Sequence, residues 1–496
     1  MGVGRRIAGK FFLLPALNAC FGLILMGQAG GQTLTVLHSF ESVFGPNTTN
    51  CDGANPSGTL VLSGNTLYGT AAYGGSAGWG TVFSVNVSGA DFTTRHHFTG
   101  GSDGASPLGG VILWSNWLYG TASSGGGGRA GTVFASGTNG ADFLNLHSFT
   151  APANDGFGFY TNRDGAYPHV GLTLAGNTLY GAANDGGSSG FGTLFAVGTN
   201  GSGFQIVHNF SSGSGGAYSS AGLILASNKL YGADYGNLGH GTVFTVNTDG
   251  TGFTNLYAFS SGHLNGNGVL TNSDGANPHA KLVLAGNTLY GTTEYGGNSG
   301  HGVIFAMTTA GTDFRALHSF AAGAYNPSGL LTNSDGANPA AELLLSGKRL
   351  YGTTTAGDRS GNGTLFMLDL NGGVFTNLYH FTATPPYPQP PINSDGANPS
   401  GGLVSSGYTF YGVTAYGGIS GNGTVFSLSF APRLTITSFG TMIVLTWPAS
   451  ASGFDYSGFK LQSASAVTGP FADVPGATRP YTNFLAGAQR FYRLSQ

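Results

Sequence analysis

The residues best suited to ligand chemistry in this 496-residue chain lie in two consecutive loops and beside the strand between them. Each loop combines an acidic, an aromatic and a histidine side chain, and one further histidine follows a proline on the same predicted face. The predicted binding residues are Asp234, Tyr235, His240, His279, Glu294, Tyr295 and His301. Aromatic rings stack on the apolar faces of sugars, and polar side chains bind their hydroxyl groups. The combination predicts a carbohydrate-binding site, with solvated loop residues as the plainer interpretation.

Six aspartates form a second set of candidates, because each begins a copy of the motif Asp-Gly-Ala-x-Pro. They are Asp52, Asp103, Asp164, Asp274, Asp335 and Asp395. If the motif enters the innermost strand of a ring, the carboxylates would surround the mouth of a central channel and could bind a cation or a polar ligand. Calcium takes about six to eight oxygen ligands, and each loop offers one carboxylate. Turn formation is therefore the competing interpretation. We predict no metal and no cofactor, with calcium at these loops left open.

The chain offers little for catalysis. A glycosidase needs two carboxylates about 5 to 9 Å apart, but Glu41, Glu294 and Glu342 share no loop. We find no phosphate-binding loop or Cys/His cluster. Five further histidines recur at equivalent repeat positions, which would spread them around a ring rather than gather them on one ion. The expectation is therefore no catalytic residue, and it leans away from an enzyme.

A repeat positions these candidates. The tripeptide Leu-Tyr-Gly, or Phe-Tyr-Gly in its last copy, recurs seven times, with Asp-Gly-Ala-x-Pro before most copies and Gly-Thr-Val-Phe or a variant after each. Alternating β-branched and aromatic residues between Gly/Asn turns predict four strands per repeat. In the fifth repeat they are 281–285, 288–293, 302–308 and 312–320. Four antiparallel strands every 50 to 60 residues are typical of a β-propeller blade.

The last repeat lacks its fourth strand, and a matching segment stands alone at 33–40. We therefore predict an all-β fold in which residues 30–430 form a seven-bladed propeller of four-stranded blades, closed by an N-terminal strand. Closure of the ring removes open sheet edges. The loops between second and third strands and the crossovers between blades share one face. Because the crossovers vary most in length, this face is the predicted working face.

Composition excludes several classes of protein. The chain has 89 glycines, 40 % hydrophobic and 7 % charged residues, and a net charge of −3. The glycines have no three-residue period, which excludes collagen, and the hydrophobic content excludes a disordered chain. No basic cluster indicates nucleic-acid binding.

The two ends differ from the repeats. Arg5, Arg6 and Lys10 precede an apolar run at 11–26 and a Gly-Gln-Ala site, which predicts a signal peptide over residues 1–29. An uncleaved anchor and a lipoprotein site at Cys20 are the alternatives. Cleavage would leave Cys51 as the single cysteine, so no disulfide is expected within the chain. We predict a secreted or cell-surface monomer with no membrane span after cleavage.

Residues 431–496 form a separate predicted domain, a small β-sandwich, with strands expected at 433–437, 442–447, 459–462 and 490–494. The segments Val-Leu-Thr-Trp-Pro and Phe-Lys-Leu-Gln resemble the first strands of a fibronectin type III-like or Ig-like module, although the domain is shorter than about 100 residues. A spacer, an export or surface-docking element and a stabilising cap are the roles considered.

Residues 33–430 resemble the GloVer "choice-of-anchor" tandem-repeat family of bacterial secreted proteins, on Asp-Gly-Ala-Asn-Pro, Leu-Tyr-Gly-Thr and Gly-Thr-Val-Phe. The resemblance implies an extracellular repeat protein with a variable C-terminal attachment module, and it implies no reaction. Repeat four departs from the motif at 215–219. Three functions follow as hypotheses: a non-catalytic binding propeller for an extracellular glycan or surface protein, a structural surface scaffold, and a polysaccharide hydrolase or lyase.

Overall fold

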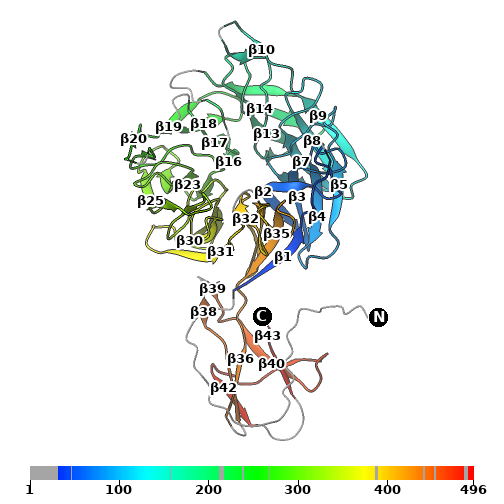
Figure 1. Ribbon diagram of the computed structural model, residues 1–496, viewed down its shortest axis with the longest axis vertical. Coiled ribbons are helices and arrows are strands. Elements are labelled where there is room, and N and C mark those ends of the chain that lie inside the picture. The colour runs from blue at the N-terminus through cyan, green and yellow to red at the C-terminus, as the bar shows by residue number, and fades with distance from the viewer. Residues whose placement is uncertain are drawn as a thin grey trace. The chain divides into compact units, whose positions relative to one another are not determined.

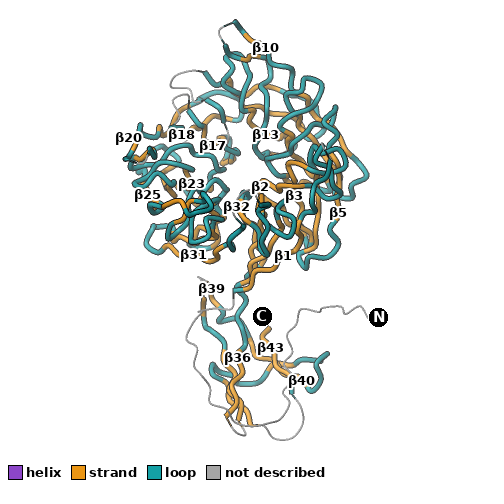
Figure 2. Tube along the Cα trace, in the orientation of Figure 1, coloured by secondary structure: helices purple, strands orange, loops and turns teal. Residues whose placement is uncertain are grey.

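The structure is a computed structural model, and it describes residues 32–495 with gaps at 46, 157, 212–216, 220, 237–239, 267, 386–388, 440–441, 452–453 and 485–489. The predicted signal peptide, residues 1–29, lies outside the described residues. Residues 34–428 form one compact unit, and residues 429–496 belong to a second. Every regular element in the described part is a strand (Figure 2).

Residues 34–428 form seven antiparallel sheets around a common centre (Figure 1). Blade 1 comprises β2 (Ala54–Ser63), β3 (Thr66–Tyr73), β4 (Thr81–Asn86) and β5 (Thr93–His97). Blade 2 comprises β6 (Val111–Trp114), β7 (Trp117–Ala122), β8 (Thr132–Gly137) and β9 (Phe143–Ser148). Blade 3 comprises β12 (Thr173–Ala175), β13 (Thr178–Ala183), β14 (Thr193–Gly198) and β15 (Gln205–Asn209).

The remaining blades repeat this order. Blade 4 comprises β16 (Ile224–Ala226), β17 (Lys229–Asp234), β18 (Thr242–Asn247) and β19 (Thr254–Ala258). Blade 5 comprises β22 (Val283–Ala285), β23 (Thr288–Thr293), β24 (Val303–Thr308) and β25 (Arg315–Ser319). Blade 6 comprises β28 (Leu344–Ser346), β29 (Arg349–Thr354), β30 (Thr364–Asp369) and β31 (Phe375–His380). Blade 7 comprises β32 (Ala397–Pro399), β33 (Val404–Ser406), β34 (Thr409–Tyr416), β35 (Thr424–Ser429) and β1 (Thr33–Ser39).

The N-terminal strand closes the ring as predicted. β1 pairs with β35 and so takes the place of the outermost strand of blade 7. The backbone N–H of Phe40 donates to the carbonyl of Gly423 at 3.1 Å, and that of Asn55 in blade 1 donates to Asn422 at 2.9 Å. The same two bonds recur around the ring, for example from Phe320 to Gly302 and from Asn338 to His301. The protein is therefore a seven-bladed β-propeller closed by its N-terminal strand.

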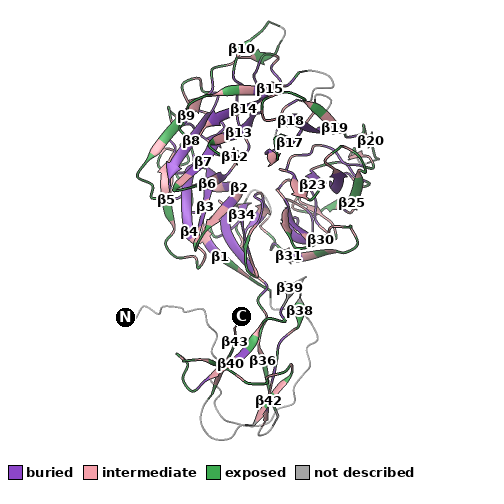
Figure 3. Ribbon diagram, turned by 180° about the vertical axis from the view of Figure 1, so that it is seen from behind, coloured by how far each residue is buried: buried purple, intermediate pink, exposed green. Residues whose placement is uncertain are grey.

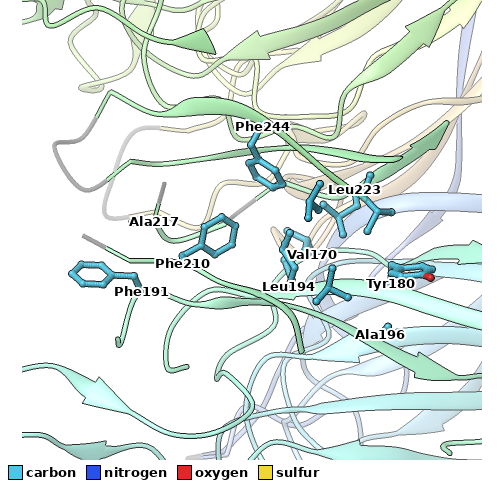
Figure 4. Close-up of a cluster of buried hydrophobic side chains, with 13 residues drawn as sticks. Val170, Tyr180, Phe191, Leu194, Ala196, Phe210, Ala217, Leu223 and Phe244 are labelled. Carbon is cyan, nitrogen blue, oxygen red and sulfur yellow. The ribbon is translucent and has the colours of Figure 1, made fainter. Parts of the chain in front are cut away.

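The core lies between neighbouring blades. Third strands such as β4, β8 and β14 are buried, whereas outer strands such as β5 and β15 are partly exposed (Figure 3). Phe210 and Phe244 pack with Leu223 at one such interface (Figure 4). The glycine of Leu-Tyr-Gly is required for this packing, because a Cβ on Gly232 would lie 2.5 Å from the ring of Phe244.

The strand boundaries differ from the prediction mainly at blade edges. In blade 5, β23 spans the predicted residues, but the innermost strand begins at Val283 and the outermost at Arg315. Three crossover insertions contain small hairpins that the sequence did not indicate. Their strands are β10 (Ala153–Asn154), β11 (Tyr160–Thr161), β20 (His263–Leu264), β21 (Leu270–Thr271), β26 (Ala324–Tyr325) and β27 (Leu331–Thr332).

The C-terminal unit contains two three-stranded sheets and one hairpin. Its strands are β36 (Thr435–Phe439), β37 (Met442–Thr446), β38 (Ser450–Ala451), β39 (Phe454–Asp455), β40 (Lys460–Ala464), β41 (Ala472–Asp473), β42 (Tyr481–Phe484) and β43 (Phe491–Ser495). Ile443, Leu445, Trp447 and Leu461 form a small buried core. Among the described residues, no helix is long and apolar enough to cross a membrane.

Candidate functional site

The six motif aspartates lie against the outer strands, which corrects the predicted ring at the channel mouth. The carboxylate of Asp164 accepts hydrogen bonds from His147 Nε2 in β9, at 3.0 Å, and from the backbone N–H of Thr150, at 3.0 Å. The crossover thus fastens the outermost strand of one blade to the entry of the next. The equivalent pairs are His38–Asp52, His96–Asp103, Tyr257–Asp274, His318–Asp335 and Tyr379–Asp395.

Aromatic stacking adds to this link between neighbouring blades. The His147 ring stacks on Phe204 of the following blade with ring centroids 3.6 Å apart. Burial would raise the pKa of the Asp164 carboxyl, but the hydrogen bonds from His147 and Thr150 hold the pKa below its usual value. Four of the five repeated histidines, His38, His96, His147 and His318, are thus hydrogen-bonded structural residues. His208 also stacks on the next blade, on Phe253. The segment that departs from the motif after it, 215–219, is described only at 217–219.

An asparagine two residues before the aspartate uses all of its polar atoms on the backbone. Asn272 Oδ1 accepts from the N–H groups of Gly275 and Gly297, and its Nδ2 donates to the carbonyls of Ser260 and Gly275. The same arrangement occurs at Asn50, Asn162, Asn333 and Asn393. The part of the chain that the structure describes contains no group of three or more His, Cys, Asp or Glu side chains able to hold a metal.

The predicted cluster in blades 4 and 5 converges on four side chains. The rings of Tyr235 and His279 meet edge to face, with centroids 5.9 Å apart. Burial, and then the charge of Glu294, raise the pKa values of Tyr235 and Tyr295. Burial lowers the pKa of His279, and Glu294 opposes this shift. His279 is therefore neutral near pH 7, and the group offers an aromatic surface, one carboxylate and one neutral imidazole.

The other three predicted residues have structural contacts. Asp234 is fully buried, and its carboxylate accepts from Thr242 Oγ1 at 2.5 Å and from the backbone N–H of Gly236. Asp234 is therefore not presented to a ligand, contrary to the prediction. The backbone carbonyls of His240 and His301 accept the inter-blade hydrogen bonds from Asn277 and Asn338. His301 is also buried, and burial lowers its pKa.

Residues at the centre of the propeller were missed. His169 occupies in blade 3 the position of His279 in blade 5, directly after the proline of the motif. Lys281 lies two residues after His279 in blade 5. It faces Glu342 of blade 6, and its Nζ lies 3.9 Å from Oε1 of that glutamate. An alignment of the seven repeats would have revealed these positions, because the other blades have glycine or threonine where Lys281 and Glu342 stand.

Large exposed apolar side chains gather on the face made by the crossovers and the loops between second and third strands. In the described propeller, Trp114, Leu144 and Val374 are the exceptions. The residues on the loop face are Phe44, Tyr73, Trp79, Phe159, Tyr160, Leu264, Tyr295, Tyr325, Ile392, Tyr416 and Ile419. Because exposed apolar groups on one face can serve in binding, this face is a candidate interaction surface.

Two open hollows occur at the ends of blades 5 and 3 that face away from the loop face. Thr288, Met307 and Arg315 line one of about 370 Å³, and Asn177, Asn200 and other polar or small residues line one of about 580 Å³. Neither is lined by an aromatic ring. The loop face therefore remains the better candidate for a functional surface.

The fold and its repeated motifs define a repeat propeller. The chain belongs to the Gloeobacter/Verrucomicrobia repeat family, whose model matches residues 21–234, 156–332 and 270–443. Among curated proteins, none matches the sequence.

Solved structures resemble the fold at low sequence identity. A nidogen/laminin complex matches at 12 % identity and a TM-score of 0.36, covering 61 % of this chain and 90 % of that one. An oligogalacturonate lyase in complex with manganese matches at 10 % sequence identity and a TM-score of 0.46, and the match covers 81 % of this chain and 98 % of that one. The extracellular domain of a putative one-component system from B. thetaiotaomicron matches at 11 % sequence identity and a TM-score of 0.45, and the match covers 82 % of this chain and 44 % of that one.

Proposed function

We propose that this protein is an exported, non-catalytic propeller that binds a glycan on its loop face. The observation that carries the proposal is the concentration of exposed rings on that face, including Trp79, Tyr295 and Tyr416. Rings exposed to water bind the apolar faces of sugars at little entropic cost, because their side chains have few rotatable bonds. Export rests on the predicted signal peptide and on the expectation that the family resemblance supplies.

The charge pattern favours a glycan over a charged protein surface. Only 7 % of the residues are charged, and His279 beside Tyr235 is neutral near pH 7. Neutral imidazole, tyrosine hydroxyl and the Glu294 carboxylate together donate and accept hydrogen bonds. These groups match the hydroxyls of a neutral sugar better than a strongly charged partner.

A glycan array tests this proposal. Residues 30–496 should bind a subset of glycans, and Tyr295→Ala should weaken that binding about threefold to tenfold, because ring contacts are worth about 0.5–1.5 kcal/mol. Trp114→Ala is the matched control, since this ring is similarly exposed but lies on the opposite face. A blank array, or an equal loss in both variants, would refute glycan binding on the loop face.

A further inference from the structure

The innermost positions of the seven blades are asymmetric. At the third residue after the motif proline, or its equivalent in repeat four, the chain has one threonine, one lysine, one glutamate and four glycines. These residues are Thr59, Gly110, Gly171, Gly222, Lys281, Glu342 and Gly402. Thr59 Oγ1 of blade 1 donates to Glu342 Oε2 of blade 6 at 3.3 Å, although blade 7 stands between those blades. Such a contact is possible only close to the propeller axis, so this layer faces the central channel.

The glycines make room for the two long side chains. A Cβ on Gly222 would lie 3.2 Å from the Lys281 side chain, and one on Gly402 would lie 3.1 Å from Cβ of Glu342. The Lys281–Glu342 pair is also loose, at 3.9 Å, and about 30 % of each side chain is exposed. An ammonium and a carboxylate with unused hydrogen-bonding capacity therefore stand side by side where solvent reaches them.

Two histidines lie one layer nearer the loop face. His279 precedes Lys281 by two residues along the entry to the innermost strand of blade 5. His169 occupies the equivalent position in blade 3, and burial, followed by the charge of His279, lowers its pKa. The ring of Tyr235 contacts His279 at the rim. The channel thus presents a balanced ion pair below two neutral imidazoles.

We propose that the channel binds the terminal sugar of a glycan chain, with neighbouring hydroxyls bridging Lys281 and Glu342. A vicinal diol matches the pair, because one hydroxyl accepts from the ammonium while the other donates to the carboxylate. The imidazoles of His169 and His279 are suited to the remaining hydroxyls, and Tyr235 to the ring face. A channel along the propeller axis admits a chain end rather than a chain interior. This inference rests on the proposed function, and it adds the mode of recognition.

Binding of single sugars to the full chain tests the channel separately from the loop face. The probes are glucose, galactose, mannose and N-acetylglucosamine, observed by saturation-transfer NMR, with tetrahydropyran-2-methanol as the ring that lacks a vicinal diol. At least one sugar should bind and the control ring should not. Lys281→Met and Glu342→Gln should each weaken that binding tenfold or more, whereas Trp114→Ala, an exposed ring on the opposite face, should leave it unchanged.

A third variant distinguishes loss of the binding site from loss of the fold. Gly222→Ala keeps both charges and narrows the space beside Lys281, so it should also weaken the binding of single sugars while the melting temperature stays near that of the wild type. Sugar binding that is absent, or that survives all three channel variants, overturns the channel proposal. If array glycans still bind in that case, the proposed function stands. If the array is blank while single sugars bind through Lys281, the channel site stands and the loop-face function fails.

Discussion

A chain that begins after Phe40 should not form a stable propeller. Removal of β1 leaves blade 7 with β35 as an unpaired edge, and open edges of this kind promote aggregation. It also removes Phe40 and Leu37 from the core shared by blades 7 and 1. We expect the truncated chain to aggregate or to lose cooperative thermal unfolding, as measured by circular dichroism and size-exclusion chromatography.

Point variants and a peptide make this prediction quantitative. Phe40→Ala should lower the free energy of unfolding by about 3–5 kcal/mol, the usual cost of removing a buried phenylalanine ring, because Phe40 is fully buried. Thr35→Ala, at an exposed position of the same strand, should cost little. A synthetic peptide of residues 31–45 should restore cooperative unfolding to the truncated chain. Normal stability of that chain without the peptide would contradict closure by β1.

Asp234→Asn should stabilise the protein above pH 6. Burial raises the pKa of the Asp234 carboxyl to about 6, despite hydrogen bonds from Thr242 and Gly236. The folded state therefore holds this proton more tightly than the unfolded chain, in which the pKa is about 3.9. The free energy of unfolding should fall as the pH rises from about 4 to about 6, by about 3 kcal/mol at about 1.4 kcal/mol per pKa unit. The Asp234→Asn variant has no carboxyl group to titrate at this position, so it lacks this loss of stability.

Urea denaturation at pH 4 and at pH 7.5 measures the effect. The gain from Asp234→Asn should appear at pH 7.5 and be absent at pH 4. Asp249→Asn is the control, because this aspartate is exposed in the same blade and hydrogen bonds from Thr251 lower its pKa; it should give no gain at pH 7.5. An equal effect of Asp234→Asn at both pH values would show that its carboxylate is not destabilised by burial.

The fold was predictable because each blade repeats the same local signals. The missing last strand and its counterpart at 33–40 were enough to predict ring closure, which β1 and β35 confirm. The hairpins in the crossovers were not predictable, because pairs of two-residue strands such as β26 and β27 are too short for a period of two residues to be visible.

The candidate site was less predictable, because the sequence places residues on a face but does not give their partners. Tyr235, His279, Glu294 and Tyr295 do come together. Asp164 and its equivalents have a clear turn pattern, yet their partners lie on an outer strand 7 to 17 residues earlier in the chain. The Lys281–Glu342 pair joins two blades, and the equivalent positions of the other blades are glycine or threonine, so no motif within a single repeat marks the pair.

Hydrogen–deuterium exchange with a glycan that binds on the array is the most direct test of the central claim, that the loop face is the binding surface. Exchange should slow in the crossover at 272–279 and in the loop at 294–301. It should not change in the turns at 286–287 and 309–311, which lie at the other end of blade 5. Slower exchange confined to those turns, or to residues 429–496, would contradict the account.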